Sequence, residues 1–95
     1  MNEDFTARAV VSTDAAPRYA KQLASHLGRR LEVRPEPEGD RLVFGEGSCL
    51  LVPGPDALEL RVRASSADAL EQLQDVVGSH LERFGQRNEL VVEWQ

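Results

Sequence analysis

Two histidines and one cysteine are the side chains of this 95-residue chain best suited to acid–base or metal chemistry. A neutral imidazole can bind a metal ion or accept a proton near neutral pH, so His80 is a candidate metal ligand or general base. Helical spacing places it on the flank of an apolar stripe. There we favour a histidine whose ring N–H bonds a backbone carbonyl. His26 belongs to the other predicted helix, which comes first in the chain. We expect it at the seam between the two helices or at the surface.

Cys49 follows a glycine-rich turn and precedes two leucines, and none of its sequence neighbours is of the kind that activates a thiolate. We therefore expect a small buried side chain. A nucleophilic role would need His80 close by in space, and an enzyme built on His80 could use Glu89 in place of the cysteine. The sequence has no phosphate-binding glycine loop, dinucleotide fingerprint, serine-hydrolase elbow or zinc-protease motif. We assign no catalytic residue, metal ligand or cofactor.

Charged residues that alternate with apolar ones along the predicted strands are a third candidate. Arg8, Arg61 and Arg63 are expected to point away from the core on one open sheet face. Guanidinium groups there can bind a carboxylate, phosphate or catecholate. The interpretation we favour is cross-strand ion pairing of these arginines with Glu32, Glu59 and Glu93, which keeps an exposed sheet soluble. A protein-binding surface is a further alternative. The expected face comprises Arg8, Glu32, Arg34, Arg41, Glu59, Arg61, Arg63 and Glu93.

These side chains must be positioned by strands and helices. Alternation of apolar and polar residues predicts strands over 6–12, 31–34, 41–44, 48–52, 58–63 and 89–95, with a turn over 35–40. Helical spacing predicts one helix from Thr13 or Asp14 to Leu27 and another over 67–84, in which Gly78 allows close packing. The order β-α-β-β-β-β-α-β predicts an α+β fold: a mainly antiparallel sheet with two helices packed on one face.

A short internal match accompanies this order. Ser25–Arg29 resembles Ser79–Arg83 at an offset of 54 residues. Two duplicated strand–helix halves would produce such a match. It fits duplication and coincidence equally well.

Size and charge limit the class of protein. A chain with 41% hydrophobic and 28% charged residues suits one globular domain, residues 1–95. The net charge of −5 argues against general nucleic-acid binding and against anionic membrane surfaces. No stretch approaches the ~20 apolar residues of a membrane span, so we expect a soluble, cytoplasmic protein. Ten arginines against one lysine, with no isoleucine, indicate a GC-rich bacterial genome.

Three segments resemble a known bacterial family. Val76–Phe84 followed by Leu90–Gln95 is similar to the C-terminal signature of the family catalogued as domain of unknown function 2218. Phe44–Cys49 is similar to its strand–turn segment, and Ala16–His26 to its first helix. The resemblance implies a strand order like that of TATA-binding-protein-like folds, with an added C-terminal strand. The family has no assigned function. Its genes often lie beside those for siderophore-iron uptake and siderophore-reducing flavoproteins, which implies an accessory role in iron acquisition.

These observations predict a non-enzymatic accessory protein of iron–siderophore metabolism that binds a ligand or a partner. Its binding surface is the open face with Arg8, Arg61 and Arg63, or a pocket between sheet and helices near His80 and Trp94. The ligand class is an anionic small molecule, and the partner class is a siderophore-reducing flavoprotein. We expect no cofactor, nucleic acid or membrane, and a monomer or homodimer. The alternatives are the small enzyme outlined above and a module that only binds proteins.

Overall fold

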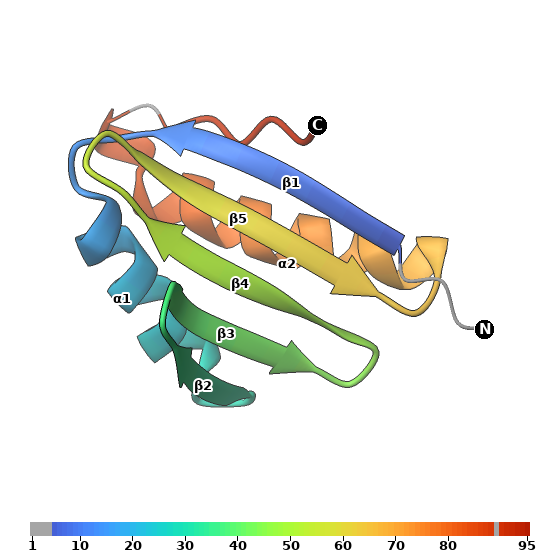
Figure 1. Cartoon of the computed structure of the whole chain (residues 1–95). Coiled ribbons are helices and arrows are strands. Elements are labelled where there is room, and N and C mark those ends of the chain that lie inside the picture. Colours follow the sequence, from blue (N-terminus) through green and yellow to red (C-terminus); the bar gives the residue numbers. More distant parts are fainter. Residues whose placement is uncertain (1–4, 89) are drawn as a thin grey trace.

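The computed structural model describes residues 5–88 and 90–95, whose helices and strands form an α+β fold (Figure 1). The predicted order of elements is confirmed for the first seven, and none of the helices in these ranges is long and apolar enough to cross a membrane. The elements are β1 (Phe5–Ser12), α1 (Ala16–Leu27), β2 (Glu32–Glu36), β3 (Gly39–Phe44), β4 (Gly47–Pro53), β5 (Ala57–Ala64), α2 (Ala67–Phe84) and the short 3-10 helix η1 (Gln86–Asn88).

Five strands form one sheet in the order β1-β5-β4-β3-β2, and both helices cover the same face of it (Figure 1). All four neighbouring pairs are antiparallel. The register places Arg8 opposite Arg61, and Leu50 between Arg61 on one side and Arg41 on the other. Because successive side chains point to opposite faces of a strand, these four share the face that the helices leave uncovered. We call it the open face.

The core lies between the sheet and the helices. Leu58, Leu60 and Val62 of β5 alternate with charged residues and are at most 2% exposed, as a strand with one wet face requires. Helix α2 begins after Ser66, whose hydroxyl accepts a hydrogen bond from the Ala69 N–H, and it spans the predicted 67–84. The apolar stripes that the helices bury are Ala16, Tyr19, Ala20, Leu23 and Leu27 of α1, and Ala69, Leu73, Val77 and Leu81 of α2.

The predicted C-terminal strand is the main correction to the fold. Residue 89 lies outside the described residues, and the segment 90–95 makes a single β-bridge, between Ala9 and Trp94. Beyond that bridge, the Gln95 N–H donates to the Arg8 carbonyl. The expected alternation is present, but Leu90, Val92 and Trp94 pack against the C-terminal half of α2 and its end. The segment therefore follows the flank of the helix instead of extending the sheet.

The turn between β2 and β3 is shorter than the predicted turn. β2 continues to Glu36 and β3 resumes at Gly39, so two residues, Pro37 and Glu38, make the turn. Gly39 has a φ of 157°, and a Cβ at this position would lie 1.8 Å from the Leu51 carbonyl oxygen. Only glycine allows this approach. The tight turn brings Glu38 over the open face.

Candidate functional site

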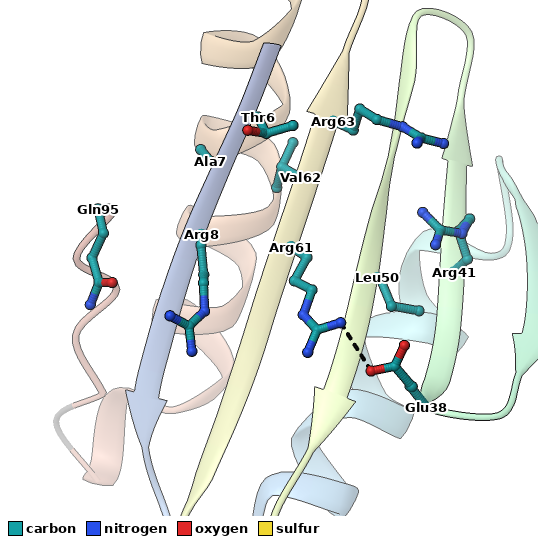
Figure 2. Close-up of a pocket in the computed structure, with 10 residues that line it drawn as sticks. All are labelled: Thr6, Ala7, Arg8, Glu38, Arg41, Leu50, Arg61, Val62, Arg63 and Gln95. Carbon is teal, nitrogen blue, oxygen red and sulfur yellow. Dashed lines mark hydrogen bonds and ion pairs between the residues drawn. The ribbon is translucent and has the colours of Figure 1, made fainter. Parts of the chain in front are cut away.

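A shallow groove of about 440 Å³ lies on the open face (Figure 2). Arg8 of β1 and Arg61 and Arg63 of β5 line it, together with Arg41 of β3, so the sequence prediction of a shared face is correct. Its remaining lining residues are Thr6, Ala7, Glu38, Leu50, Val62 and Gln95.

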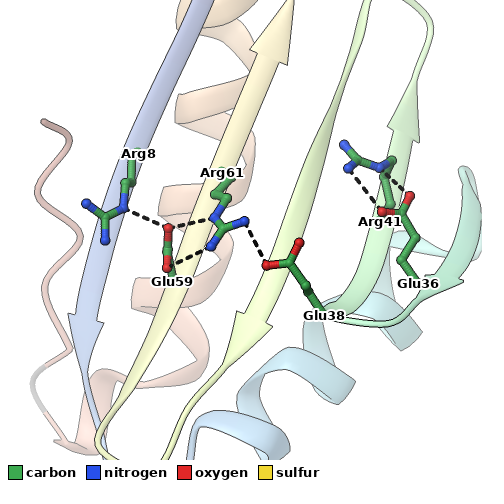
Figure 3. Close-up of polar contacts among 6 residues, drawn as sticks. All are labelled: Arg8, Glu36, Glu38, Arg41, Glu59 and Arg61. Atoms are coloured by element: carbon green, nitrogen blue, oxygen red, sulfur yellow. Dashed lines mark hydrogen bonds and ion pairs between the residues drawn. The ribbon is translucent and has the colours of Figure 1, made fainter.

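The carboxylates of Glu59 and Glu38 hold Arg8 and Arg61 in place (Figure 3). Glu59 Oε2 accepts a hydrogen bond of 2.7 Å from Arg8 Nε and another of 2.7 Å from Arg61 Nε. Nη1 of Arg61 also donates to Glu38 at 2.9 Å. The hydrogen bond from Arg61, followed by that from Arg8, lowers the pKa of Glu59 below its ordinary value, against the opposing effect of burial. The cross-strand pairing with Glu59 that we favoured from the sequence is confirmed for Arg8, whereas Arg61 pairs with Glu59 of its own strand and with Glu38.

The pairing continues toward the sheet edge. Arg41 donates to Glu36 through Nε and Nη2 and to the Ser48 hydroxyl through Nη1. Leu50, whose neighbours on this face are Arg41 and Arg61, is only 4% exposed. An anion arriving at Arg61 or Arg41 must therefore compete with a carboxylate that the protein itself supplies.

A second cavity, of about 460 Å³, brings the two histidines together. The ring centres of His26, near the end of α1, and His80 of α2 lie 5.2 Å apart. Nδ1 of His80 lies 2.6 Å from the Val76 carbonyl oxygen, so the expected bond to a backbone carbonyl is present. His80 is half-buried and His26 is exposed, as the helical spacing predicts.

All the charged side chains that line this cavity are cationic. Arg29 and Arg30 follow the end of α1, and the lining includes no carboxylate. Within residues 5–88 and 90–95, neither of these arginines makes an ion pair. The negative end of the helix dipole offsets only about half a charge. We name this cavity the cationic pocket, lined by His26, Leu27, Arg29, Arg30, Leu31, Phe44, Val76 and His80.

The structure separates two residues that the sequence prediction placed in one pocket. Trp94 lies with Gly78 and Val92 in a shallow depression beside α2, whereas His80 lines the cationic pocket with His26.

Cys49 offers no nucleophile. It is fully buried, and desolvation raises the pKa of its thiol to about 12, so the thiol keeps its proton at neutral pH. Glu89, the other partner considered for His80, lies outside the described residues. In the part of the chain that is described, no three side chains among His, Cys, Asp and Glu gather as a metal-binding group.

Sequence reasoning missed the meeting of His26 with His80 and the placement of two arginines beside them. One signal was available, because the matching segments Ser25–Arg29 and Ser79–Arg83 each carry one of the histidines at the same place. The structure shows that both segments lie where α1 meets α2.

Comparison with known proteins identifies relatives but no activity. A family model described as an uncharacterized protein conserved in bacteria matches residues 8–95. The fold is similar to the NMR structure of PA4090 from Pseudomonas aeruginosa, with a TM-score of 0.80 and 33% sequence identity over 96% of this chain and 95% of that one. No curated protein is significantly similar to the chain. The chain therefore belongs to the bacterial family of domain of unknown function 2218.

Proposed function

We propose that this protein is a non-enzymatic binding protein that takes an anionic small molecule in the cationic pocket, as an accessory to iron–siderophore metabolism. One observation carries the proposal. The pocket presents Arg29 and Arg30 beside two imidazoles, without a carboxylate in its lining, in a chain whose net charge is −5. Like charges gathered without counter-charges favour an anionic ligand.

The walls of the pocket narrow the class of ligand. Phe44, Leu31 and Val76 are apolar and flank the cationic groups. A ligand that fits both parts has a flat apolar body with a carboxylate or catecholate at one end. A guanidinium bound to such a group contributes a net 1.5–3 kcal/mol or so per charge-assisted hydrogen bond.

The open face is the competing location for the same ligand. Arg8, Arg61 and Arg63 line a groove of similar volume, but Glu59 and Glu38 already accept from Arg8 and Arg61. An anion gains less there, because the charges of Arg8 and Arg61 are already offset by Glu59 and Glu38. This difference ranks the cationic pocket above the open face.

The link to iron is supported by the gene neighbourhood of the family, which includes siderophore uptake and siderophore-reducing flavoproteins. From that neighbourhood we propose that the partner is a flavoprotein and that the bound ligand is passed to it. The absence of a reactive thiol at Cys49 supports a binding role over a catalytic one.

A titration of ¹⁵N-labelled protein with metal-free 2,3-dihydroxybenzoate tests the proposal. We expect the amide resonances of residues 26–31 to shift, and the double variant Arg29→Gln/Arg30→Gln to bind at least about tenfold more weakly, a loss of about 1.4 kcal/mol. The matched control is Arg61→Gln/Arg63→Gln, which removes the same two charges from the open face. Equal weakening by both pairs, weakening by the control pair alone, or no binding at all would overturn the assignment to this pocket.

A further inference from the structure

We infer that His26 and His80 coordinate one transition-metal ion, so that the anion taken by the cationic pocket is a negatively charged metal chelate with open coordination positions. The inference rests on the proposed function for the place of the anion and adds the identity of its centre. The chain has two histidines, 54 residues apart in the sequence, and their ring centres lie 5.2 Å apart.

The bond to Val76 determines which nitrogen of His80 is available to a metal ion. A carbonyl oxygen only accepts hydrogen bonds, so Nδ1 of His80 carries the proton that it shares with Val76. Nε2 of the neutral ring then keeps its lone pair. Metal-binding histidines are commonly oriented by the same kind of bond from their second nitrogen to a backbone carbonyl. His26 is exposed and His80 half-buried, so an ion can reach both from solvent.

The spacing of the rings suits two ligands of one ion. A metal–nitrogen bond of about 2.1 Å places each imidazole centre about 3.2 Å from the ion. Two such centres lie about 4.5 Å apart when the bonds meet at a right angle and about 5.2 Å apart at the tetrahedral angle. The observed separation is 5.2 Å. Phe84 lies edge-on beside His26, with 5.4 Å between the two ring centres.

The surrounding charges select a chelate over a free ion. Arg29 and Arg30 line the same pocket and repel a bare divalent cation. The described residues also offer no group of three or more His, Cys, Asp or Glu side chains that would complete a protein-only site. Two imidazoles suit nickel, copper, zinc or iron whose other positions are filled by an acidic chelator. The arginines then stabilise the carboxylates of the chelator.

Calorimetric titration with Ni²⁺–nitrilotriacetate tests this arrangement, because the complex carries one negative charge and leaves two adjacent positions open. We expect the protein to bind it, and His26→Ala and His80→Ala each to weaken binding by about tenfold or more. Unchanged affinity in His26→Ala, whose side chain is exposed, would overturn the inference. His80→Ala is read alongside its circular dichroism spectrum, which reports whether the fold is retained.

Two further variants separate coordination from other contacts. Phe84→Leu removes the ring beside His26 but keeps both imidazoles, so binding of the nickel complex should persist. A loss of affinity as large as that in His26→Ala would mean that ring packing, and not coordination, holds the complex. Arg29→Gln/Arg30→Gln should weaken binding of the complex while strengthening binding of bare Ni²⁺. The same change in both would contradict the selection of a chelate.

The outcomes also distinguish this inference from the proposed function. Loss of nickel-complex binding in the histidine variants, with no effect of the Arg29 and Arg30 substitutions on dihydroxybenzoate, supports the metal pair and overturns the anion site. The reverse pattern supports the anion site and overturns the metal pair.

Discussion

Glu59 is the residue that organises the open face. It is 18% exposed at its side chain and accepts from both Arg8 and Arg61, which come from neighbouring strands. A carboxylate shared by two guanidiniums gains more than an isolated surface pair, because it is partly shielded from solvent and one of its partners, Arg61, is also held by Glu38. This one side chain therefore joins β1 to β5 on the side that lacks a helix.

Replacing Glu59 should make the protein less sensitive to acid. Its pKa is lowered in the folded state, so its contribution to stability is present above its ordinary pKa of 4.5 and is lost as pH falls through the folded value. We expect Glu59→Gln to lower the free energy of unfolding at neutral pH by about 1 kcal/mol, and to change little at a pH well below the folded value. Urea denaturation at both pH values measures the difference.

Glu32→Gln is the control for this prediction. Glu32 and Arg34 form a pair with side chains 57% and 60% exposed, and such pairs contribute little. Equal effects of the two substitutions at neutral pH would contradict the special role of Glu59.

The pairing on this face could be predicted in part. Alternation along β1 and β5 places Arg8, Glu59 and Arg61 on one face, and that prediction is correct. Glu38 could not be predicted as a partner of Arg61. Its position depends on a two-residue turn inside a longer run of prolines, glutamates and glycine, where the sequence does not mark the turn's limits.

At the scale of elements, α2 contains a glycine that the packing does not require. From the sequence, Gly78 was expected to allow a close approach, and Trp94 and Val92 do lie against it. A Cβ there would meet its nearest neighbour, Trp94 Nε1, at 3.4 Å, which is ordinary contact. The approach of the tail therefore leaves room for one methyl group.

Gly78→Ala should stabilise the protein. Alanine in a helix interior is favoured over glycine by about 0.5–1 kcal/mol, and no clash opposes this gain. Thermal and urea unfolding of the variant measure it. The contrasting substitution is Gly47→Ala, because a Cβ there would lie 2.2 Å from the Arg63 carbonyl oxygen and should destabilise. Destabilisation by Gly78→Ala would show that the tail packs more tightly on α2 than described.

Sequence periodicity predicts the range of α2 correctly but does not predict how the C-terminal segment packs. The range of α2 follows from its apolar stripe and from Ser66 as its cap. The C-terminal segment has the alternation of a strand, but a strand also needs a partner along its length. Contacts of Leu90 and Trp94 with α2 compete with pairing to β1, and the sequence does not reveal that competition.

At the scale of the whole molecule, the tail is a peripheral part of a two-layered structure. Segment 90–95 joins β1 through one bridge and one further backbone bond, while the inner strands β3, β4 and β5 are paired on both sides. Few backbone bonds hold the tail, so it should open before the sheet does.

Trp94, the single tryptophan, reports on that opening. We expect its fluorescence to change at a lower urea concentration than the circular dichroism of the helices and sheet. Superimposable transitions would mean that the tail unfolds with the core as one cooperative unit. Circular dichroism of the same samples gives the stability of the helices and the sheet.

The cationic pocket also belongs to this scale, because no single segment contains it. His26 and His80 are 54 residues apart and meet only when both helices pack on the same sheet face. Sequence periodicity correctly placed one at a surface and the other on the flank of a stripe. It could not give their separation, which depends on how the two helices lie across the strands.

The low exposure of Leu50 bears on why the chain uses arginine in place of lysine. Its two neighbours on the open face are arginines, whose methylene stems cover apolar surface while their charged ends are held by carboxylates. They act as a substitute for a missing third layer. A lysine has a flexible stem and no planar fork to fix its direction, so it would cover the sheet less well. The excess of arginine over lysine, which codon usage alone can explain, thus also serves a protein that leaves one side of its sheet without helices.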